Sequence, residues 1–237
     1  MKNKPLIIIQ SRFNSKRLHG KALYPICGLP LISFLIKRLK LNLPADYMIV
    51  LATTENEEDD ILARWAAEEN IHSFRGSDNN VLERYKDCLK KFPSNTIVRV
   101  TGDNPLTCPK IIEWLVSIKT SHKKDYIFCD NLPYGAGADV FDSDILLQIE
   151  KKTNLDDERE HINLHILRNI KNFKTTFPKA EKKIARPDLR ITVDTIEDWL
   201  IINQLFLNDN DKQYNIPLEE VIQRMDRLNV RKSNHIP

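Results

Sequence analysis

An α/β fold with a mainly parallel central sheet is the architecture that this 237-residue sequence predicts. Short apolar runs alternate with amphipathic segments through the first 120 residues or so, which is typical of right-handed βαβ units. All six glycines lie between these segments, where the backbone must turn or approach another part of the chain closely. We therefore expect helices on both faces of the sheet.

Five apolar runs are predicted to be strands. The run PLIIIQ at 5–10 is rich in β-branched residues and lies between Pro5 and a polar loop. A continuous apolar run of this length indicates a strand that is buried on both faces. The other predicted strands are 47–54, 71–76, 96–103 and 189–195.

Six segments have the apolar spacing of helices. In 30–40, Leu31, Phe34 and Leu35 share one face, and Pro30 suits a first helical turn. The segment 56–70 begins with carboxylates, which favour the positive end of a helix dipole. The other predicted helices are 80–91, 109–121, 196–207 and 217–228.

No internal repeat or Gly/Ser-rich linker divides the chain. We therefore predict one domain over residues 1–237. The region 125–185 is richly charged and less regular than the rest. It is predicted to be an irregular insertion.

The composition limits the partners and the compartment. A net charge of +3 is too small to indicate non-specific nucleic-acid binding, although it allows a basic pocket for a small anion. The four cysteines form no C-x-x-C pair, which favours free thiols in a cytoplasmic protein. No apolar run reaches the roughly 20 residues of a membrane span, and the N-terminal run is too short for a signal peptide.

A basic loop follows the first predicted strand. In SRFNSKRLHGK, the four cations Arg12, Lys16, Arg17 and Lys21 surround Gly20. Ligands of an open parallel sheet bind beyond the carboxyl ends of its strands, where this loop lies. Dispersed positive charge and backbone N–H groups suit a triphosphate. The alternative is a solvated basic loop, and neither the Walker nor the dinucleotide motif is present.

Two aspartates lie at the carboxyl ends of predicted strands. Asp103 ends the apolar run in RVTGDNPL, and Asp194 ends that in RITVDTIEDW. Mg²⁺ takes oxygen ligands and often binds through one or two carboxylates plus phosphate oxygens. Two such aspartates on one sheet edge could share a metal ion. The alternatives are an aspartate turn at Asp103 and a helix cap at 194–195.

The order of five motifs resembles that of the sugar cytidylyltransferases. The motifs are IIQSRFNSKRLHGKAL, FRGSDNNVLERY, VRVTGDNPL, REH and LRITVDTIEDW. The most similar group is the spore-coat-polysaccharide type, which is related to enzymes that make CMP-activated nonulosonic and octulosonic acids. The resemblance implies a Rossmann-like nucleotide-diphospho-sugar transferase fold. It also implies Mg²⁺-dependent transfer of CMP from CTP to a sugar acid or related surface-polysaccharide precursor, with release of pyrophosphate.

The resemblance also implies roles for individual residues. The residues expected at the triphosphate are Arg12, Ser15, Arg17 and Lys21, and Gln10 and Ser11 are also expected to bind CTP. Those expected near the nucleotide, or bracing its loop, are Arg75, Ser77 and Arg84. Asp103 and Asp194 would bind Mg²⁺, with Asp103 also at the nucleotide. The residues expected at the sugar are Asp139, Glu160 and His161. The catalytic residues would be Arg12, Lys21, Asp103 and Asp194.

Three positions depart from the pattern of the family. His19 stands where a proline is usual, which suggests a less rigid loop. Gly137 stands where an acidic residue is usual, and Asp139 where a glutamate is usual. In the family this segment lies towards the acceptor, and the region 125–185 would form part of a homodimer contact.

Two other motifs offer alternative functions. The sequence DSD at 142–144 matches the acidic motif of metal-dependent glycosyltransferases, although it also suits a helix cap. His161 and His165 have the spacing of two metal ligands on one helix face, but the H-E-x-x-H glutamate is missing. A non-catalytic nucleotide-binding homologue is the third alternative.

Overall fold

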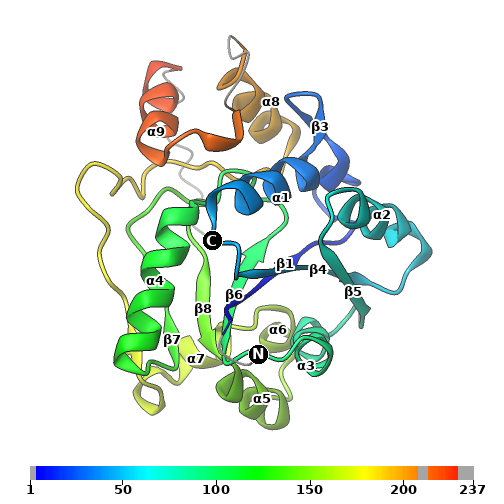
Figure 1. Ribbon diagram of the computed structural model, residues 1–237, viewed down its shortest axis with the longest axis vertical. Coiled ribbons are helices and arrows are strands. Elements are labelled where there is room, and N and C mark those ends of the chain that lie inside the picture. The colour runs from blue at the N-terminus through cyan, green and yellow to red at the C-terminus, as the bar shows by residue number, and fades with distance from the viewer. Residues whose placement is uncertain (1–3, 208–212, 229–237) are drawn as a thin grey trace.

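A computed structural model describes residues 4–207 and 213–228 of the chain (Figure 1). Within these residues, seven strands form one sheet in the order β5-β4-β1-β6-β8-β7-β9. The strands β5, β4, β1 and β6 are all parallel, as are β7 and β9, whereas β8 is antiparallel to both of its neighbours. The predicted α/β class with a mainly parallel sheet is confirmed. The strand bounds are β1 Leu6–Gln10, β4 Met48–Thr54, β5 His72–Gly76, β6 Thr96–Thr101, β7 Tyr126–Ile127, β8 Asp139–Asp142 and β9 Thr175–Thr176.

Helices cover both faces of the sheet because alternate residues of the strands point to opposite sides. In β1, Ile7 and Ile9 join one buried apolar cluster, whereas Leu6 and Ile8 join the other. The first cluster is covered by α1 Leu31–Asn42, α2 Asp60–Glu68, α4 Pro109–His122, α8 Ile196–Gln204 and α9 Leu218–Arg227. The second is covered by α3 Val81–Lys91, α5 Ser143–Lys152 and the short helix α7 Leu164–Arg168. The short helix α6 Asp156–Glu160 contacts α3. Figure 1 shows α1 and α2 above the strands and α3 and α5 below them.

The shorter elements lie at the turns. A two-stranded hairpin precedes α1, and its turn residues Cys27 and Gly28 both have positive φ angles, of 52° and 78°. The hairpin strands are β2 Pro25–Ile26 and β3 Leu29–Pro30. The 3₁₀ helices are η1 Lys21–Leu23, η2 Glu57–Asp59, η3 Ile170–Asn172 and η4 Gln213–Asn215. No helix in the described ranges is both long and apolar enough to span a bilayer.

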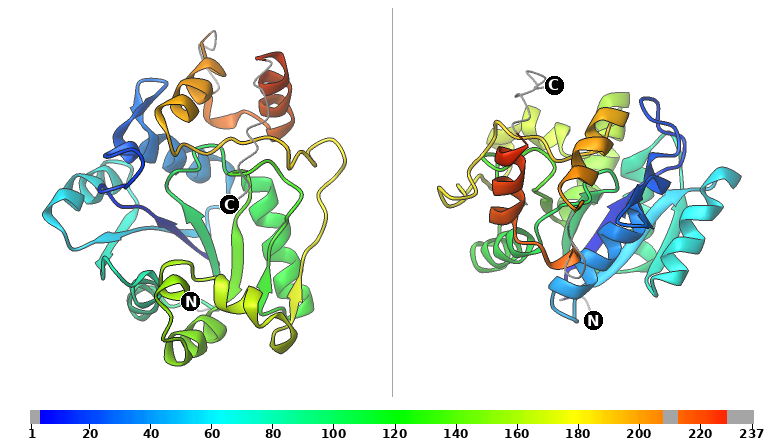
Figure 2. Two further views of the ribbon diagram at one scale, coloured as in Figure 1. Left: turned by 180° about the vertical axis from the view of Figure 1, so that it is seen from behind. Right: turned by 90° about the horizontal axis from the view of Figure 1, so that it is seen from above.

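Four of the five predicted strands are confirmed, as β1, β4, β5 and β6, and all six predicted helices form. The predicted strand 189–195 is wrong. This segment is extended, but it crosses the carboxyl ends of the central strands on its way to α8 (Figure 2). Its backbone partners are loops: Arg190 forms an isolated bridge with Tyr134, and the amide of Val193 donates to the carbonyl of Asp103 at 2.8 Å. Apolar and polar residues alternate in this crossing segment, which imitates the sequence pattern of a strand.

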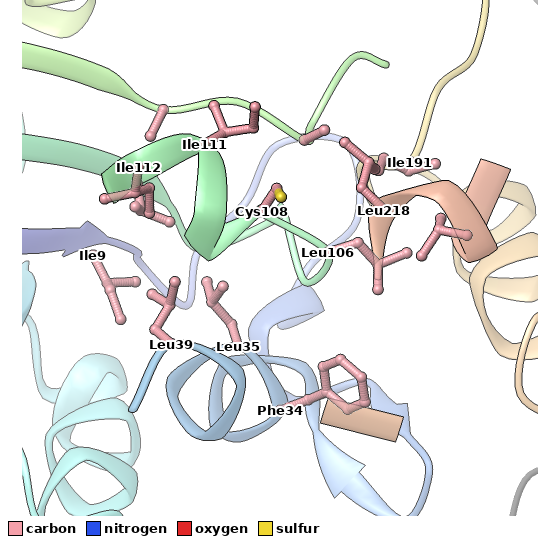
Figure 3. Close-up of a cluster of buried hydrophobic side chains, with 14 of the residues drawn as sticks. Ile9, Phe34, Leu35, Leu39, Leu106, Cys108, Ile111, Ile112, Ile191 and Leu218 are labelled. Atoms are coloured by element: carbon pink, nitrogen blue, oxygen red, sulfur yellow. The ribbon is translucent and has the colours of Figure 1, made fainter. Parts of the chain in front are cut away.

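The core explains why the crossing segment has a fixed position. Figure 3 shows Ile191 beside Leu218 of α9, above the side chains of α1 and to the right of Ile111 and Ile112 of α4. Ile191 is fully buried, and Leu189 and Val193 on either side are also buried. Their burial anchors the chain immediately before Asp194.

The region 125–185 also differs from its prediction in detail. It supplies the strands β7, β8 and β9 to the central sheet. These strands are only two to four residues long, so the sequence contains no apolar run long enough to reveal them. Long irregular stretches connect them.

Candidate active site

Asp103, Asp194 and Lys21 meet at the carboxyl edge of the sheet. Asp103 follows β6, Asp194 ends the crossing segment, and Lys21 begins η1. The Nζ atom of Lys21 lies 2.7 Å from Oδ2 of Asp103 and 2.8 Å from Oδ1 of Asp194. One ammonium group therefore bridges two carboxylates that are far apart in the sequence.

Asp194 is the most buried member of this cluster. Only 4% of its side chain is exposed, and burial alone would raise its pKa. Lys21 and Arg17 contact its Oδ1, Arg17 at 2.7 Å, and Arg190 contacts Oδ2. These cations outweigh burial, so the pKa of Asp194 is lowered below its usual value of 3.8. The carboxylate is thus held in its charged form.

This lowered pKa predicts how stability depends on pH. A carboxylate whose pKa is lower in the folded state stabilises the protein at pH values above its unfolded pKa, here about 3.8. That contribution is lost as the pH falls through the folded pKa. We expect Asp194→Asn to flatten the dependence of the unfolding free energy on pH below about pH 4. Urea unfolding at a series of pH values measures this, and an unchanged acid slope would contradict it.

The basic loop after β1 closes on itself. The carbonyl oxygen of Phe13 accepts hydrogen bonds from the amides of Ser15, at 2.9 Å, and Gly20, at 3.0 Å. Gly20 has a φ of +67°, a conformation that glycine adopts at least cost. The ring of His19 packs edge-on against that of Phe13, with 5.0 Å between the ring centroids. His19 thus contributes packing at the position where the family usually has proline.

Asp59 fastens this loop to the end of β4. Its Oδ1 accepts from the amide of Phe13 at 2.6 Å, and its Oδ2 accepts from the amide of Thr54 at 2.9 Å. The side-chain hydroxyl of Thr54 also donates to Oδ2. Asp59 is 2% exposed, so these bonds are shielded from water. A single carboxylate sets the distance between the basic loop and β4.

Replacing Asp59 by asparagine is expected to loosen the loop. An amide cannot accept on both sides as the carboxylate does, so one buried N–H loses its partner. We expect the unfolding free energy to fall by about 2 kcal/mol, and the KM for the CTP that the resemblance implies to rise. Chemical denaturation and steady-state kinetics measure the two effects. Asp46→Asn, at an exposed position, is the control, and equal behaviour of the two variants would contradict the assignment.

Gly102 brings the loop after β6 against the basic loop. Its amide donates to the carbonyl of Gln10 at 2.7 Å. A Cβ atom at position 102 would lie 2.6 Å from Cβ and 2.7 Å from Oγ of Ser11. Only glycine fits this approach. Gln10 and Ser11 are therefore in contact with the turn that carries Asp103.

Arg12 of the basic loop contacts two carboxylates outside the Lys21 cluster. Its guanidinium lies 3.3 Å from the carboxylate of Asp78 and 3.6 Å from that of Glu160. Glu160 and His161 are exposed at the end of α6. The structure therefore brings one predicted sugar residue, Glu160, next to a predicted triphosphate residue.

Arg75, Ser77 and Arg84 contact the backbone of neighbouring turns. Arg75 donates to the carbonyls of Thr54, at 2.9 Å, and Asn56, at 2.7 Å. Arg84 is 1% exposed and donates from Nε to the carbonyl of Ser77 at 2.9 Å. Burial lowers the pKa of Arg84. Two roles were open for these residues, contact with the nucleotide or support of its loop. The contacts of Arg75 and Arg84 with backbone carbonyls are of the second kind.

Asp139 lies inside the sheet, at the start of β8. It is 5% exposed and pairs with Arg99 of β6 at 2.8 Å. Its other oxygen accepts from the hydroxyl of Tyr126 and from the side-chain amide of Asn163. Asp139 is thus engaged by protein partners on both oxygens.

The two alternative motifs have structural roles. His161 and His165 do not share one helix face, because α6 ends at Glu160 and His165 belongs to α7, where it contacts Glu158 at 2.7 Å. Within the described residues, no group of three or more His, Cys, Asp or Glu side chains is arranged to hold a metal. In the DSD motif, Asp142 caps α5 by accepting from the amide of Asp144, and it pairs with Lys119 at 2.9 Å.

The residues of this site all fall within one family match. A model of the family described as cytidylyltransferase matches residues 6–229. The chain belongs to the cytidylyltransferase family. It is therefore a nucleotidyltransferase, as the sequence motifs predict.

Individual relatives agree with this assignment. This cytidylyltransferase is 30% identical to the spore coat polysaccharide biosynthesis protein SpsF of Bacillus subtilis over 95% of each chain. Its fold matches that of a cytidylyltransferase from Leptospira borgpetersenii with a TM-score of 0.90 and 27% identity, covering 99% of each chain. It also matches a CMP:2-keto-3-deoxy-manno-octonic acid synthetase complexed with CTP, with a TM-score of 0.66, over 88% of this chain and 100% of that one. At 16% identity, this last likeness shows the fold.

The donor set of the cytidylyltransferase site fits a divalent cation. Asp103 and Asp194 each direct a carboxylate oxygen at the same cationic atom, Nζ of Lys21. Hard cations such as Mg²⁺ bind through one or two carboxylates together with phosphate oxygens. Two converging carboxylates beside a basic loop offer that combination.

Sequence reasoning missed two residues of the site. Arg190 lies in the predicted strand 189–195, and it pairs with Asp194, four residues later, and with Asp198. Its spacing from these two aspartates is the signal in the sequence. Asp59 lies in the acidic start of the predicted helix 56–70, and its bond to Phe13 spans 46 positions. No local pattern reveals such a contact.

Proposed function

We propose that this cytidylyltransferase transfers CMP from CTP to a sugar acid or related surface-polysaccharide precursor and releases pyrophosphate in a Mg²⁺-dependent reaction. The observation that supports this most directly is the meeting of Asp103 and Asp194 at Lys21 in the basic loop. The site thus combines oxygen ligands for a metal with cations for a triphosphate. Mg²⁺ held by Asp103 and Asp194 would neutralise charge on the phosphate oxygens.

The residues of the chain have separate tasks in this reaction. A hydroxyl of the acceptor attacks the α-phosphorus of CTP and gives up its proton to water, and the bond from that phosphorus to the oxygen bridging to the β-phosphorus breaks. Pyrophosphate leaves with the electron pair of that bond. Arg12, Arg17 and Lys21 would neutralise the triphosphate and the developing charge on the leaving group. Asp59 and Gly102 would keep the loop aligned, which matters because such catalysis depends mainly on positioning.

The acceptor is proposed to bind near the end of α6. Glu160 reaches Arg12 across 3.6 Å, so a sugar contacting Glu160 would lie beside the nucleotide loop. The chain's similarity to a spore coat polysaccharide biosynthesis protein supports a polysaccharide precursor. By resemblance to the family, we further propose a cytoplasmic homodimer in which the region 125–185 contributes to the subunit contact. Size-exclusion chromatography with light scattering tests the dimer.

Pyrophosphate release tests the proposed activity. Protein, Mg²⁺ and CTP are mixed with a panel of sugar acids, and the same panel is tested with ATP, GTP and UTP. We expect release with CTP and at least one sugar acid, and no release without an acceptor. CTP binding without turnover of any acceptor would favour a non-catalytic homologue. Transfer from a nucleotide sugar would favour a glycosyltransferase, although Asp142 of the DSD motif caps a helix.

A further inference from the structure

Lys21 lies where two negatively charged groups converge. Its ammonium is within 2.8 Å of an oxygen of Asp103 and of Asp194, and its side chain is only 13% exposed. We propose that Lys21 is a counterion that closes the metal site until a triphosphate draws it away, so that metal and nucleotide bind with positive coupling. This inference rests on the proposed function and concerns the regulation of the same site.

Electrostatics makes Lys21 and a divalent cation compete. Oδ2 of Asp103 and Oδ1 of Asp194 both accept hydrogen bonds from Nζ of Lys21. They are also the oxygens that would bind the metal ion. A metal ion bound by these oxygens would lie close to the ammonium, and repulsion between like charges is strong in a partly buried site. The cation must therefore displace Lys21 or bind weakly.

A triphosphate provides the alternative partner that Lys21 needs. The lysine stem is flexible, so its ammonium can exchange carboxylates for phosphate oxygens. Arg17, whose side chain is 65% exposed, also contacts Oδ1 of Asp194 and can make the same exchange. Both movements would expose the carboxylate oxygens to the metal ion.

Arg190 keeps Asp194 in place during this exchange. It contacts Oδ2, the oxygen that Lys21 does not touch, and it also pairs with Asp198. Its guanidinium stacks on the ring of Tyr134 at 5.0 Å from the centroid. Arg190 is therefore a positioning residue that leaves Oδ1 directed at the metal site. Because the coupling between two ligands is reciprocal, the nucleotide raises the affinity for the metal by the same factor by which the metal raises the affinity for the nucleotide.

Mn²⁺ binding to the protein without nucleotide tests the proposal, since free Mn²⁺ can be counted by electron paramagnetic resonance. We expect Lys21→Met to bind Mn²⁺ about tenfold more tightly than wild type. Lys16→Met is the matched control, because it removes the same charge from an exposed position in the same loop. It should bind Mn²⁺ as wild type does. The double variant Lys21→Met/Asp103→Asn should lose the gain, which places the ion at the carboxylates.

A second measurement follows the reverse coupling. In EDTA, Asp103→Asn should bind CTP several-fold more tightly than wild type, because one of the two groups that hold Lys21 has lost its charge. Circular dichroism confirms that each variant is folded. Equal Mn²⁺ affinities of wild type and Lys21→Met would overturn the proposal. So would an equal gain in Lys16→Met, since loop charge and not the Lys21 bridge would then set the affinity.

The two proposals fail in distinguishable ways. If wild type releases pyrophosphate from CTP but Lys21→Met gains no Mn²⁺ affinity, the coupling is wrong and the function stands. If wild type neither binds nor turns over CTP, the function is wrong, whatever the Mn²⁺ measurement gives.

Discussion

Asp103→Asn is expected to slow Mg²⁺-dependent pyrophosphate release about 1,000-fold and to unfold at the same temperature as wild type within a few degrees. The substitution keeps the shape of the side chain but removes the charge that would hold the metal. The fold should survive because the backbone carbonyl of Asp103 still accepts from the amide of Val193 at 2.8 Å and the hydroxyl of Thr192 at 3.2 Å. Initial rates of pyrophosphate release and calorimetry measure the two effects.

The control for this variant is Asp130→Asn. Asp130 pairs with Lys179 on the surface, with 46% and 66% of the two side chains exposed. Asp130→Asn makes the same chemical change away from the candidate site, so the activity of this variant should equal that of wild type. Normal turnover by Asp103→Asn would show that the metal assignment is wrong.

Gly102→Ala is expected to reduce kcat/KM for CTP about 100-fold, as displacements of about 1 Å can in an aligned site. The added methyl would lie 2.6 Å from Cβ of Ser11 and 3.1 Å from the carbonyl oxygen of Gln10. Contacts this short force the turn that carries Asp103 away from the basic loop. Steady-state kinetics at saturating acceptor measures the loss.

Two further variants separate this effect from a general cost of replacing glycine. Gly137→Ala should be nearly neutral, because its Cβ would meet Phe128 and Leu132 at ordinary distances of 3.5 and 3.6 Å. Ser11→Gly/Gly102→Ala removes the two shortest contacts and should recover part of the activity. A Gly102→Ala protein with wild-type kinetics would contradict the role given to this approach.

The sequence predicts an element of the fold well where its apolar run is continuous or its amphipathic pattern extends over several turns. The β-branched run at 5–10 and the amphipathic segment at 80–91 are both confirmed, as β1 and α3. The segment 189–195 shows the limit of this reasoning. Its apolar residues Ile191 and Val193 alternate with polar ones as in a strand, yet their backbone amides donate to loops rather than to strands. Periodicity records which residues are apolar and not what covers them.

The sequence allows us to predict which residues lie at the carboxyl edge of the sheet, and so which types of side chain form the candidate site. Because parallel strands end at one edge, the residues following β1 and β6 were expected to meet. Contacts that depend on side-chain reach were not predictable, such as the bond from Asp59 to Phe13 and the stacking of Arg190 on Tyr134. Asp139, expected at the sugar, is paired with Arg99 inside the sheet. Its pairing depends on the register of β6 with β8, which the sequence does not reveal.

The bridge at Lys21 also bears on how the protein acquires activity during folding. Its contact with Asp194 joins residues 173 positions apart. Closing so long a loop has a high entropic cost and must follow the formation of more local contacts. A nascent or partly folded chain can therefore form β1, β4, β5 and β6 before Asp194 joins Asp103 in the site. Activity should accordingly appear as one of the last events of folding, after the sheet has formed.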